Sequence, residues 1–305
     1  MESTQRTTQA QRTLIKPLPP VGPLAGPVLS PTVNLDDPPL REEDRALLAS
    51  GDIQYKRLPG VLIRDNISAD DINQGSIGDC YFLAALSSVA NSNPAFIRES
   101  IRMNADGTYT VRFFRQGKPI YVRVDGDIPQ TRWGTPIYGT STDSGELWVS
   151  IMEKAYAKLQ LGYHQINKGG YPEEALRVLT GIGTKVKFIL DDHPDKIYSI
   201  LKKSLGKGRS VVASTYGANK KFERNGVIGH HAYTVLRVYE KNGMKYVELR
   251  NPWGHKEWNG SADGANDGTF SMPIAEFQKY FSKISATEKY PREARPLGRL
   301  RMLAV

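Results

Sequence analysis

The chain has 305 residues, a formal net charge of +9 at pH 7 and 39% hydrophobic residues. This length exceeds the usual size of one domain, and the hydrophobic content is sufficient for more than one buried core. The single cysteine, Cys80, excludes an intramolecular disulfide and is typical of a reducing compartment. We find no apolar stretch long enough to span a membrane and no secretory signal pattern, so a cytoplasmic location is the default expectation.

The two ends of the chain are predicted to lie outside the folded core. Residues 1–40 contain eight prolines and few aromatic residues, which predicts a disordered segment. This segment could be a simple linker or an inhibitory arm that lies across an active site. Residues 289–305 form a basic tail in which four arginines face one acid, Glu293. The tail could be a solvated extension or an attachment point for an anionic surface, and nucleic acid is not expected as a partner.

The stretch that leads into Cys80 favours a reactive thiol. Two glycines and an aspartate interrupt regular structure, and the apolar run 81–90 then predicts a helix that begins near Cys80. Unpaired amide groups and the helix dipole favour an anion there, so we expect the thiol pKa to be lowered toward or below neutrality. Gln74 could donate its side-chain amide to a developing oxyanion, beside the Cys80 backbone amide. The alternative is a buried structural cysteine.

A second set of residues lies far downstream. Asn242-Gly243, flanked by residues that favour strands, is a strong signal for a hairpin. Folding the chain there brings His231 and Asn251 to the same open end of the hairpin. An Asn carboxamide at that place can accept a hydrogen bond from the imidazole and aim its other nitrogen at a thiolate.

The rest of the chain is predicted to mix helices and strands. The expected helices cover 147–159 and 195–205, and the expected strands cover 108–114, 119–124, 184–190, 210–215 and 268–271. Most of these strands follow residue 170, so a mainly helical part precedes a part that is richer in strand.

Three motifs together resemble those of the calpain cysteine proteases. They are Gln74-Gly75-Ser76-Ile77-Gly78-Asp79-Cys80, Gly229-His230-His231-Ala232-Tyr233 and Arg250-Asn251-Pro252-Trp253-Gly254. The similarity extends over roughly residues 50 to 285. It implies an α+β, papain-like core with a helical first lobe (41–170) and a β-rich second lobe (171–288). It also implies that Cys80 is the nucleophile, His231 the base, Asn251 its orienting partner and Gln74 part of the oxyanion hole.

His230 is the rival of His231, because successive side chains of a strand point to opposite faces. The family pattern places the catalytic histidine directly before Ala-Tyr, which favours His231. One cysteine and five dispersed histidines offer no zinc-ligand spacing.

The resemblance also implies calcium as a cofactor, with one ion in each lobe. The matching acids are Asp71 and Glu146 in the first lobe and Glu257 and Asp267 in the second. Thr269 stands where the family usually has a glutamate, and the loop before it is short, with Asp263 as its candidate ligand. We therefore expect the first site to be retained in preference to the second. Ordinary surface charge is the alternative for all of these acids.

The function implied by the resemblance is that of a cysteine endopeptidase that cuts extended or unfolded protein segments. We see no EF-hand loop in these residues. Two other functions stay open: an acyltransferase of the transglutaminase type, which Asn251 disfavours, and a protease-like binding module without activity. Calcium dependence and oligomeric state are not predicted.

Overall fold

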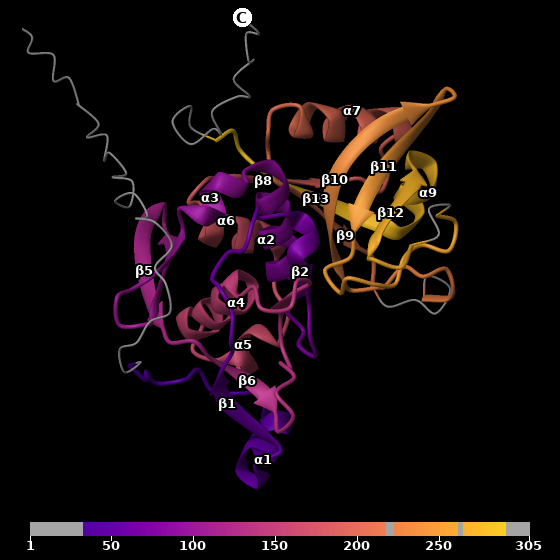
Figure 1. Cartoon of the computed structure of the whole chain (residues 1–305). Helices are drawn as coiled ribbons and strands as arrows, with labels where there is room; N and C mark the ends of the chain where they lie inside the picture. Colours follow the sequence, from indigo (N-terminus) through magenta and orange to yellow (C-terminus); the bar gives the residue numbers. More distant parts are fainter. Residues whose placement is uncertain (1–32, 218–222, 262–264, 291–305) are drawn as a thin grey trace, which may run out of the picture.

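The computed structural model describes residues 33–217, 223–261 and 265–290, and these residues form two lobes that lie side by side. Figure 1 shows the first lobe in indigo to magenta and the second lobe, dominated by one sheet, in orange to yellow. The expected α+β, papain-like arrangement of a helical lobe and a β-rich lobe is confirmed. No helix among the described residues combines the length and apolar character needed to cross a membrane.

The first lobe contains most of the helices. They are α1 (Glu42–Ser50), the 3-10 turn η1 (Ala69–Asp71), α2 (Cys80–Ser92), α3 (Pro94–Arg98), α4 (Trp148–Leu159), α5 (Tyr163–Ile166) and α6 (Pro172–Thr180). Its strands are β1 (Ile53–Arg57), β2 (Ile72–Asn73), β3 (Ile101–Met103), β4 (Tyr109–Arg115), β5 (Lys118–Val124), β6 (Asp127–Thr131) and β7 (Thr140–Ser141). The strands form three small antiparallel sheets, β3-β4-β5, β1-β6 and β2-β7.

The second lobe is built on one antiparallel sheet of six strands in the order β12-β11-β10-β9-β13-β8. The strands are β8 (Thr184–Phe188), β9 (Val211–Thr215), β10 (Ala232–Lys241), β11 (Met244–Arg250), β12 (Thr269–Pro273) and β13 (Phe281–Thr287), and the helices are α7 (Pro194–Leu205) and α9 (Ile274–Tyr280). Ile197, Leu201 and Phe277 of these helices are buried in a core that they share with the sheet.

Helix α2 is the element that joins the lobes. All residues from Tyr81 to Ala90 are buried, because α2 packs on α6 in the first lobe and on β10 in the second. A helix that is apolar on every side is stable only in such an enclosed position. The hydroxyl of Thr234 in β10 donates a hydrogen bond of 2.8 Å to the carbonyl of Ala84. The first residue of α2, Cys80, is thereby fixed relative to the start of β10.

The predicted hairpin is present, with Lys241 of β10 paired to Met244 of β11. Asn242 and Gly243 have φ values of 53° and 74°, the left-handed conformations that a two-residue turn between twisted strands requires. A bulge between Val235 and Arg237 shifts the register of the hairpin before it reaches its open end. The sequence did not predict α9 or β13, and a similar bulge interrupts the alternation at the start of β13.

The predicted disorder of residues 1–40 is wrong for residues 33–40. Leu40 is buried in the first core, and the amide of Leu35 donates to the Asp125 carboxylate at 2.6 Å. The carboxylate of Asp37 lies 2.5 Å from the ammonium of Lys154, which needs a partner because it is almost fully buried. Residues 1–32, with the predicted inhibitory arm, and residues 291–305 of the basic tail lie outside the described residues.

Two predicted boundaries also differ from the structure. The boundary at residue 170 assigns α6 to the second lobe, but its buried side chains Ala175, Leu176 and Leu179 belong to the first core. The boundary at residue 288 assigns Tyr290 to the tail, but this ring is buried against Phe96. Helix α6 and Tyr290 both pack on the apolar surface of the first core. Local sequence patterns do not show which core a segment packs on.

Candidate active site

Cys80 occupies the first position of α2, where the sequence predicted it. The loop before it needs glycine because other backbone segments approach closely. A Cβ atom on Gly75 or Gly78 would lie 2.5 Å from the carbonyl oxygen of Ile137 or Asn167, respectively. The Gly78 amide also donates to the Asn167 side chain at 2.9 Å. These contacts hold the loop so that Cys80 keeps part of its surface exposed.

His231 and Asn251 lie at the open end of the hairpin and contact each other. The imidazole Nε2 of His231 is 2.8 Å from Oδ1 of Asn251, and both residues are buried. The Nδ2 group of Asn251 donates to the carbonyls of His255 at 2.9 Å and Lys256 at 3.0 Å. These two bonds fix the orientation of the carboxamide, so Nε2 of His231 carries the proton of the shared bond and Nδ1 is free to accept one.

Aromatic rings enclose this hydrogen bond. The Trp253 ring lies 5.0 Å from the imidazole of His231, and the Tyr233 ring meets the imidazole edge-on at 4.9 Å. The amide of Trp253 donates to Oδ1 of Asn251 at 3.1 Å, which adds a further constraint on the carboxamide. A hydrogen bond that is shielded from water in this way is electrostatically stronger than one in solvent.

The pKa values favour a neutral thiol and a neutral imidazole in this structure. Burial raises the pKa of the Cys80 thiol to about 11, although a hydrogen bond from the Ala232 backbone opposes that shift. Burial also lowers the pKa of His231 to about 4, against the effect of its bond to Asn251. This direction is the opposite of the expected lowering of the thiol pKa, because desolvation outweighs the stabilising groups around the sulfur.

Gln74 lies beside the second lobe, with its backbone amide 2.7 Å from the carbonyl of Pro252. Its side chain is buried, and its Nε2 group donates to the carbonyl of Ile77 in the loop before Cys80. Oε1 of Gln74 has no hydrogen-bond partner among the described residues. The predicted oxyanion donor is thus close to the site but is engaged within its own loop.

The other histidines are occupied elsewhere. His230 is exposed and has a left-handed φ of 50°, so it is not part of a regular strand as the sequence analysis assumed. His164 contacts Gln165, His193 accepts a hydrogen bond from the amide of Asp195, and His255 contacts the carbonyl of Trp253. Among the described residues, His231 is the histidine whose imidazole is hydrogen-bonded to the Asn251 side chain.

The structure brings together the two acids of the first predicted calcium site. Asp71 Oδ2 and Glu146 Oε2 both accept from the indole nitrogen of Trp148, at 3.2 and 3.1 Å. Burial, and to a smaller extent the charge of Glu146, raises the pKa of Asp71 to about 6. Asp71 also accepts from the amide of Ser68, and Glu146 accepts from the amide of Arg64. Two carboxylates that converge in this way offer oxygen ligands to a hard cation.

The acids of the second predicted site are engaged in bonds within their loop. Glu257 accepts from the amide of Gly268 at 2.9 Å, and Asp267 accepts from the amide of Thr269 at 2.8 Å. Asp263 lies outside the described residues. No group of three His, Cys, Asp or Glu side chains arranged to hold a metal occurs in the described part of the chain. The second site therefore stays a prediction.

The sequence analysis missed a buried pair of carboxyl groups next to Cys80. Asp79 and Glu153 are both almost fully buried, and Glu153 accepts from the amide of Gly139 at 2.9 Å. Burial raises the pKa of Asp79 to about 7, and burial together with the charge of Asp79 raises that of Glu153 well above its usual range. The pair therefore retains a proton near neutral pH. No local pattern links two residues that are so far apart in the chain.

Comparisons with known proteins agree with the motifs. The family described as "Calpain family cysteine protease" matches residues 50–264. The "Calpain-type cysteine protease ADL1" of Oryza sativa subsp. japonica is 35% identical over 263 residues, which are 77% of this chain and 12% of that protein. "Calpain-8" of Rattus norvegicus is 30% identical over 253 residues, which are 72% of this chain and 36% of that protein. The chain thus spans only a minor part of the length of these relatives.

Solved structures of other proteins also show some similarity to this chain. The digestive procathepsin L 3 of the Tenebrio molitor larval midgut aligns with 80% of this chain and 77% of its own, at 14% identity and a TM-score of 0.31. A likeness this weak carries no argument about the fold, which rests on the lobes described above.

Proposed function

The chain belongs to the calpain family of cysteine proteases, and from this premise we propose that it hydrolyses peptide bonds through Cys80, His231 and Asn251. The observation that carries the proposal is the bond between Nε2 of His231 and Oδ1 of Asn251, at the end of the strand that packs on the helix of Cys80. A thiol nucleophile requires a base, and the base requires a group that fixes its tautomer.

The proposed reaction follows from the position of the proton on His231, which lies on Nε2 and leaves Nδ1 able to accept a second proton. Nδ1 of His231 accepts the thiol proton as the Cys80 sulfur attacks the peptide carbonyl, so the thiol and the imidazole exchange a proton during the reaction. The imidazolium then donates that proton to the leaving amine, and a thioester to Cys80 remains. A water molecule, deprotonated by His231, attacks the thioester and releases the acid and the free thiol.

The oxyanion of each step needs hydrogen-bond donors. The backbone amide of Cys80 lies in the first turn of α2, where amides have no partner within the helix. The amide of the Gln74 side chain is the second donor in this proposal, and it reaches the oxyanion after it leaves the carbonyl of Ile77.

We place a calcium ion at Asp71 and Glu146. When bound, it supplies positive charge to two carboxylates that otherwise repel each other. Asp71 ends the turn that precedes the Cys80 loop, and Glu146 precedes α4, so both acids belong to the first lobe. Calorimetry should detect calcium binding to the wild type and its loss in Asp71→Ala. Unchanged binding by this variant would contradict the assignment.

The substrate class in this proposal is protein with extended or unfolded segments, as the resemblance to the calpain family implies. The test is cleavage of unfolded casein by the wild type, in calcium and in excess chelator, with Cys80→Ala as the blank. Cleavage by the wild type alone is expected. Equal cleavage in calcium and in chelator would support the roles of Cys80, His231 and Asn251 but would show that activity does not depend on calcium. Absence of cleavage in both conditions would contradict the proposed activity.

A further inference from the structure

We propose that Arg250 is a positioning residue of this active site, which sets the two lobes in the register that lets Asn251 orient His231 beside Cys80. This inference rests on the proposed function. The effect of Arg250 on the bond between His231 and Asn251 can nevertheless be measured without an activity assay. Arg250 is the last residue of β11, directly before Asn251, and its side chain is almost fully buried.

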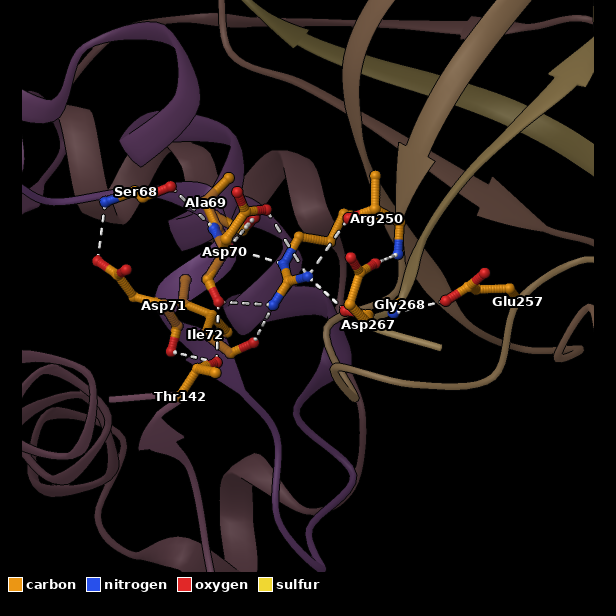
Figure 2. A network of polar contacts seen from close by, with 12 residues as sticks. Ser68, Ala69, Asp70, Asp71, Ile72, Thr142, Arg250, Glu257, Asp267 and Gly268 are labelled. Atoms are coloured by element: carbon orange, nitrogen blue, oxygen red, sulfur yellow. Dashed lines mark hydrogen bonds and ion pairs between the residues drawn. The ribbon is translucent and has the colours of Figure 1, made fainter. Parts of the chain in front are cut away.

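The guanidinium of Arg250 crosses from the second lobe to a turn of the first. Nε donates to the carbonyl of Ala69 at 2.8 Å, and Nη2 donates to the carbonyls of Asp70 and Ile72 at 2.8 and 2.9 Å. Figure 2 shows the side chain reaching from its strand into the segment that contains these three residues. Three carbonyls of one short turn thus depend on a single side chain from the other lobe.

The remaining donors of Arg250 bind within the second lobe. Nη1 donates to the carbonyl of Asp267 at 2.7 Å and contacts the Thr269 hydroxyl at 3.5 Å. All five N–H groups of a guanidinium can therefore be used at once, which no lysine could reproduce. Figure 2 places Arg250 between the Asp70 turn on one side and the Asp267 loop on the other.

The charge of Arg250 has little direct compensation. The nearest carboxylate oxygen, on Asp70, is 3.8 Å away, and that side chain is 71% exposed. The buried cation is instead stabilised by the dipoles of four backbone carbonyls. A buried charge that is held by fixed carbonyls is costly to displace, so these contacts define one relative position of the two segments.

Both segments lead directly to the reacting groups. The turn 69–72 continues through Gln74 to Cys80, and the amide of Gln74 donates to the carbonyl of Pro252, two residues after Arg250. The amide of Asn251 donates to the carbonyl of Gly268, at the end of the loop that Arg250 also binds. A shift at Arg250 therefore moves Asn251 and the Cys80 loop relative to each other.

The experiment compares Arg250→Ala with the wild type, using a fluorogenic peptide taken from a casein cleavage site. We expect kcat to fall about 100-fold with little change in KM, because misplaced reacting groups impair chemistry more than binding. Guanidinium chloride at millimolar concentration should restore kcat saturably, since the small cation can occupy the vacated space. Arg237→Ala is the matched control, because Arg237 lies on the same hairpin but is exposed and bound to Glu248.

A second readout does not require turnover. In protein labelled with 15N-histidine, the Nε2 proton of His231 should give a downfield resonance in the wild type and in Arg237→Ala, and this resonance should be lost in Arg250→Ala. If Arg250→Ala does not fold, Arg250→Lys serves instead, with an expected loss in kcat of about tenfold, because lysine reaches fewer carbonyls.

The outcomes separate this inference from the proposed function. A wild type that cleaves no peptide would reject the protease function, and the His231 resonance would still decide the role of Arg250. A folded Arg250→Ala or Arg250→Lys variant with the wild-type resonance would overturn the positioning role. So would wild-type kcat in such a variant, or a loss of kcat that guanidinium does not restore.

Discussion

The side chain of Asn251 uses all of its hydrogen-bonding groups, and one of its bonds is to His231. Its Oδ1 atom receives bonds from His231 and Trp253, and its Nδ2 group donates to two backbone carbonyls. The residue is completely buried, so water cannot replace any of these bonds. Orientation of the base and stability of the loop therefore depend on the same side chain.

For Asn251→Ala we expect kcat to fall about 100-fold, because His231 loses the bond that fixes its tautomer and direction. The free energy of unfolding should fall by about 1–3 kcal/mol, because the carbonyls of His255 and Lys256 and the imidazole of His231 lose their partner. Peptide kinetics and urea unfolding measure the two effects. Asn259→Ala is the control, since exposed Asn259 binds the carbonyl of Arg224. An unchanged kcat in Asn251→Ala would contradict the role assigned to this residue.

The reactivity of Cys80 should increase with pH well above neutrality. Only the thiolate reacts with iodoacetamide, and burial raises the pKa of this thiol to about 11. The rate of alkylation in the free protein should therefore still be rising between pH 7 and pH 9. The rate is measured by mass spectrometry of the Cys80 peptide. A rate that is already at its plateau near pH 5 would show a preformed thiolate and would contradict the neutral pair.

At the scale of elements, the contact of α2 with α4 contains the protonated pair of Asp79 and Glu153. The folded protein holds a proton on Asp79 up to a pH of about 7, whereas the unfolded chain releases it near its ordinary pKa of 3.8. Stability from this group is therefore complete below about pH 4 and is lost as the pH rises toward 7. At about 1.4 kcal/mol for each pKa unit, the change is at most roughly 4 kcal/mol.

Asp79→Asn should remove this pH dependence, because the amide carries no charge to desolvate. Urea unfolding of the wild type and the variant at several values between pH 4 and pH 8 measures the difference between their stabilities. The variant should gain stability relative to the wild type as the pH rises. Parallel curves for the two proteins would mean that Asp79 does not titrate in this range.

The sequence predicted the elements whose signals are local. The Asn242-Gly243 turn, the helix that begins at Cys80 and the apolar face of α4 each need only neighbouring residues to be recognised. The contact of His231 with Asn251 followed from the hairpin, because both residues flank its open end. The motif order identified the family, and the family supplied the choice between His230 and His231.

Other features depend on contacts between distant segments, and no local pattern encodes them. The burial of Cys80 and the resulting rise of its pKa arise from the packing of β10 on α2. The hydrogen bonds from Arg250 to the carbonyls of residues 69–72 link segments that are about 180 residues apart in the chain. Strand β13 lies between β9 and β8, a position that only the completed sheet defines.

At the scale of the whole molecule, the folded unit begins before α1. Lys154 is 1% exposed and binds Asp125 and Asp37, and Asp37 belongs to the segment that was predicted to be disordered. Deletion of residues 1–40 should lower the free energy of unfolding by about 1–3 kcal/mol relative to deletion of residues 1–32, because the buried ammonium loses one partner. Urea unfolding of the two truncated proteins decides this. Equal stabilities would contradict a structural role of residues 33–40.

Three contacts between the two lobes lie near the proposed catalytic residues, whereas Asn91, Ser92 and Glu173 of the first lobe bind Leu236, Ser210 and Lys283 of the second lobe elsewhere. Thr234 binds Ala84 of α2, Gln74 binds Pro252, and Arg250 binds the turn before β2. These three contacts fix the two lobes relative to each other close to Cys80 and His231. In the proposed function, activity therefore depends on them.

The central claim is that Cys80 forms a covalent acyl intermediate with the help of His231. The most direct measurement is rapid acid quenching of the protein with an activated peptide ester, followed by mass spectrometry of its digest. We expect an acyl group on the Cys80 peptide of the wild type within the first turnover, and a much slower acylation in His231→Ala. No acylation at Cys80, or equal rates in the wild type and His231→Ala, would contradict it.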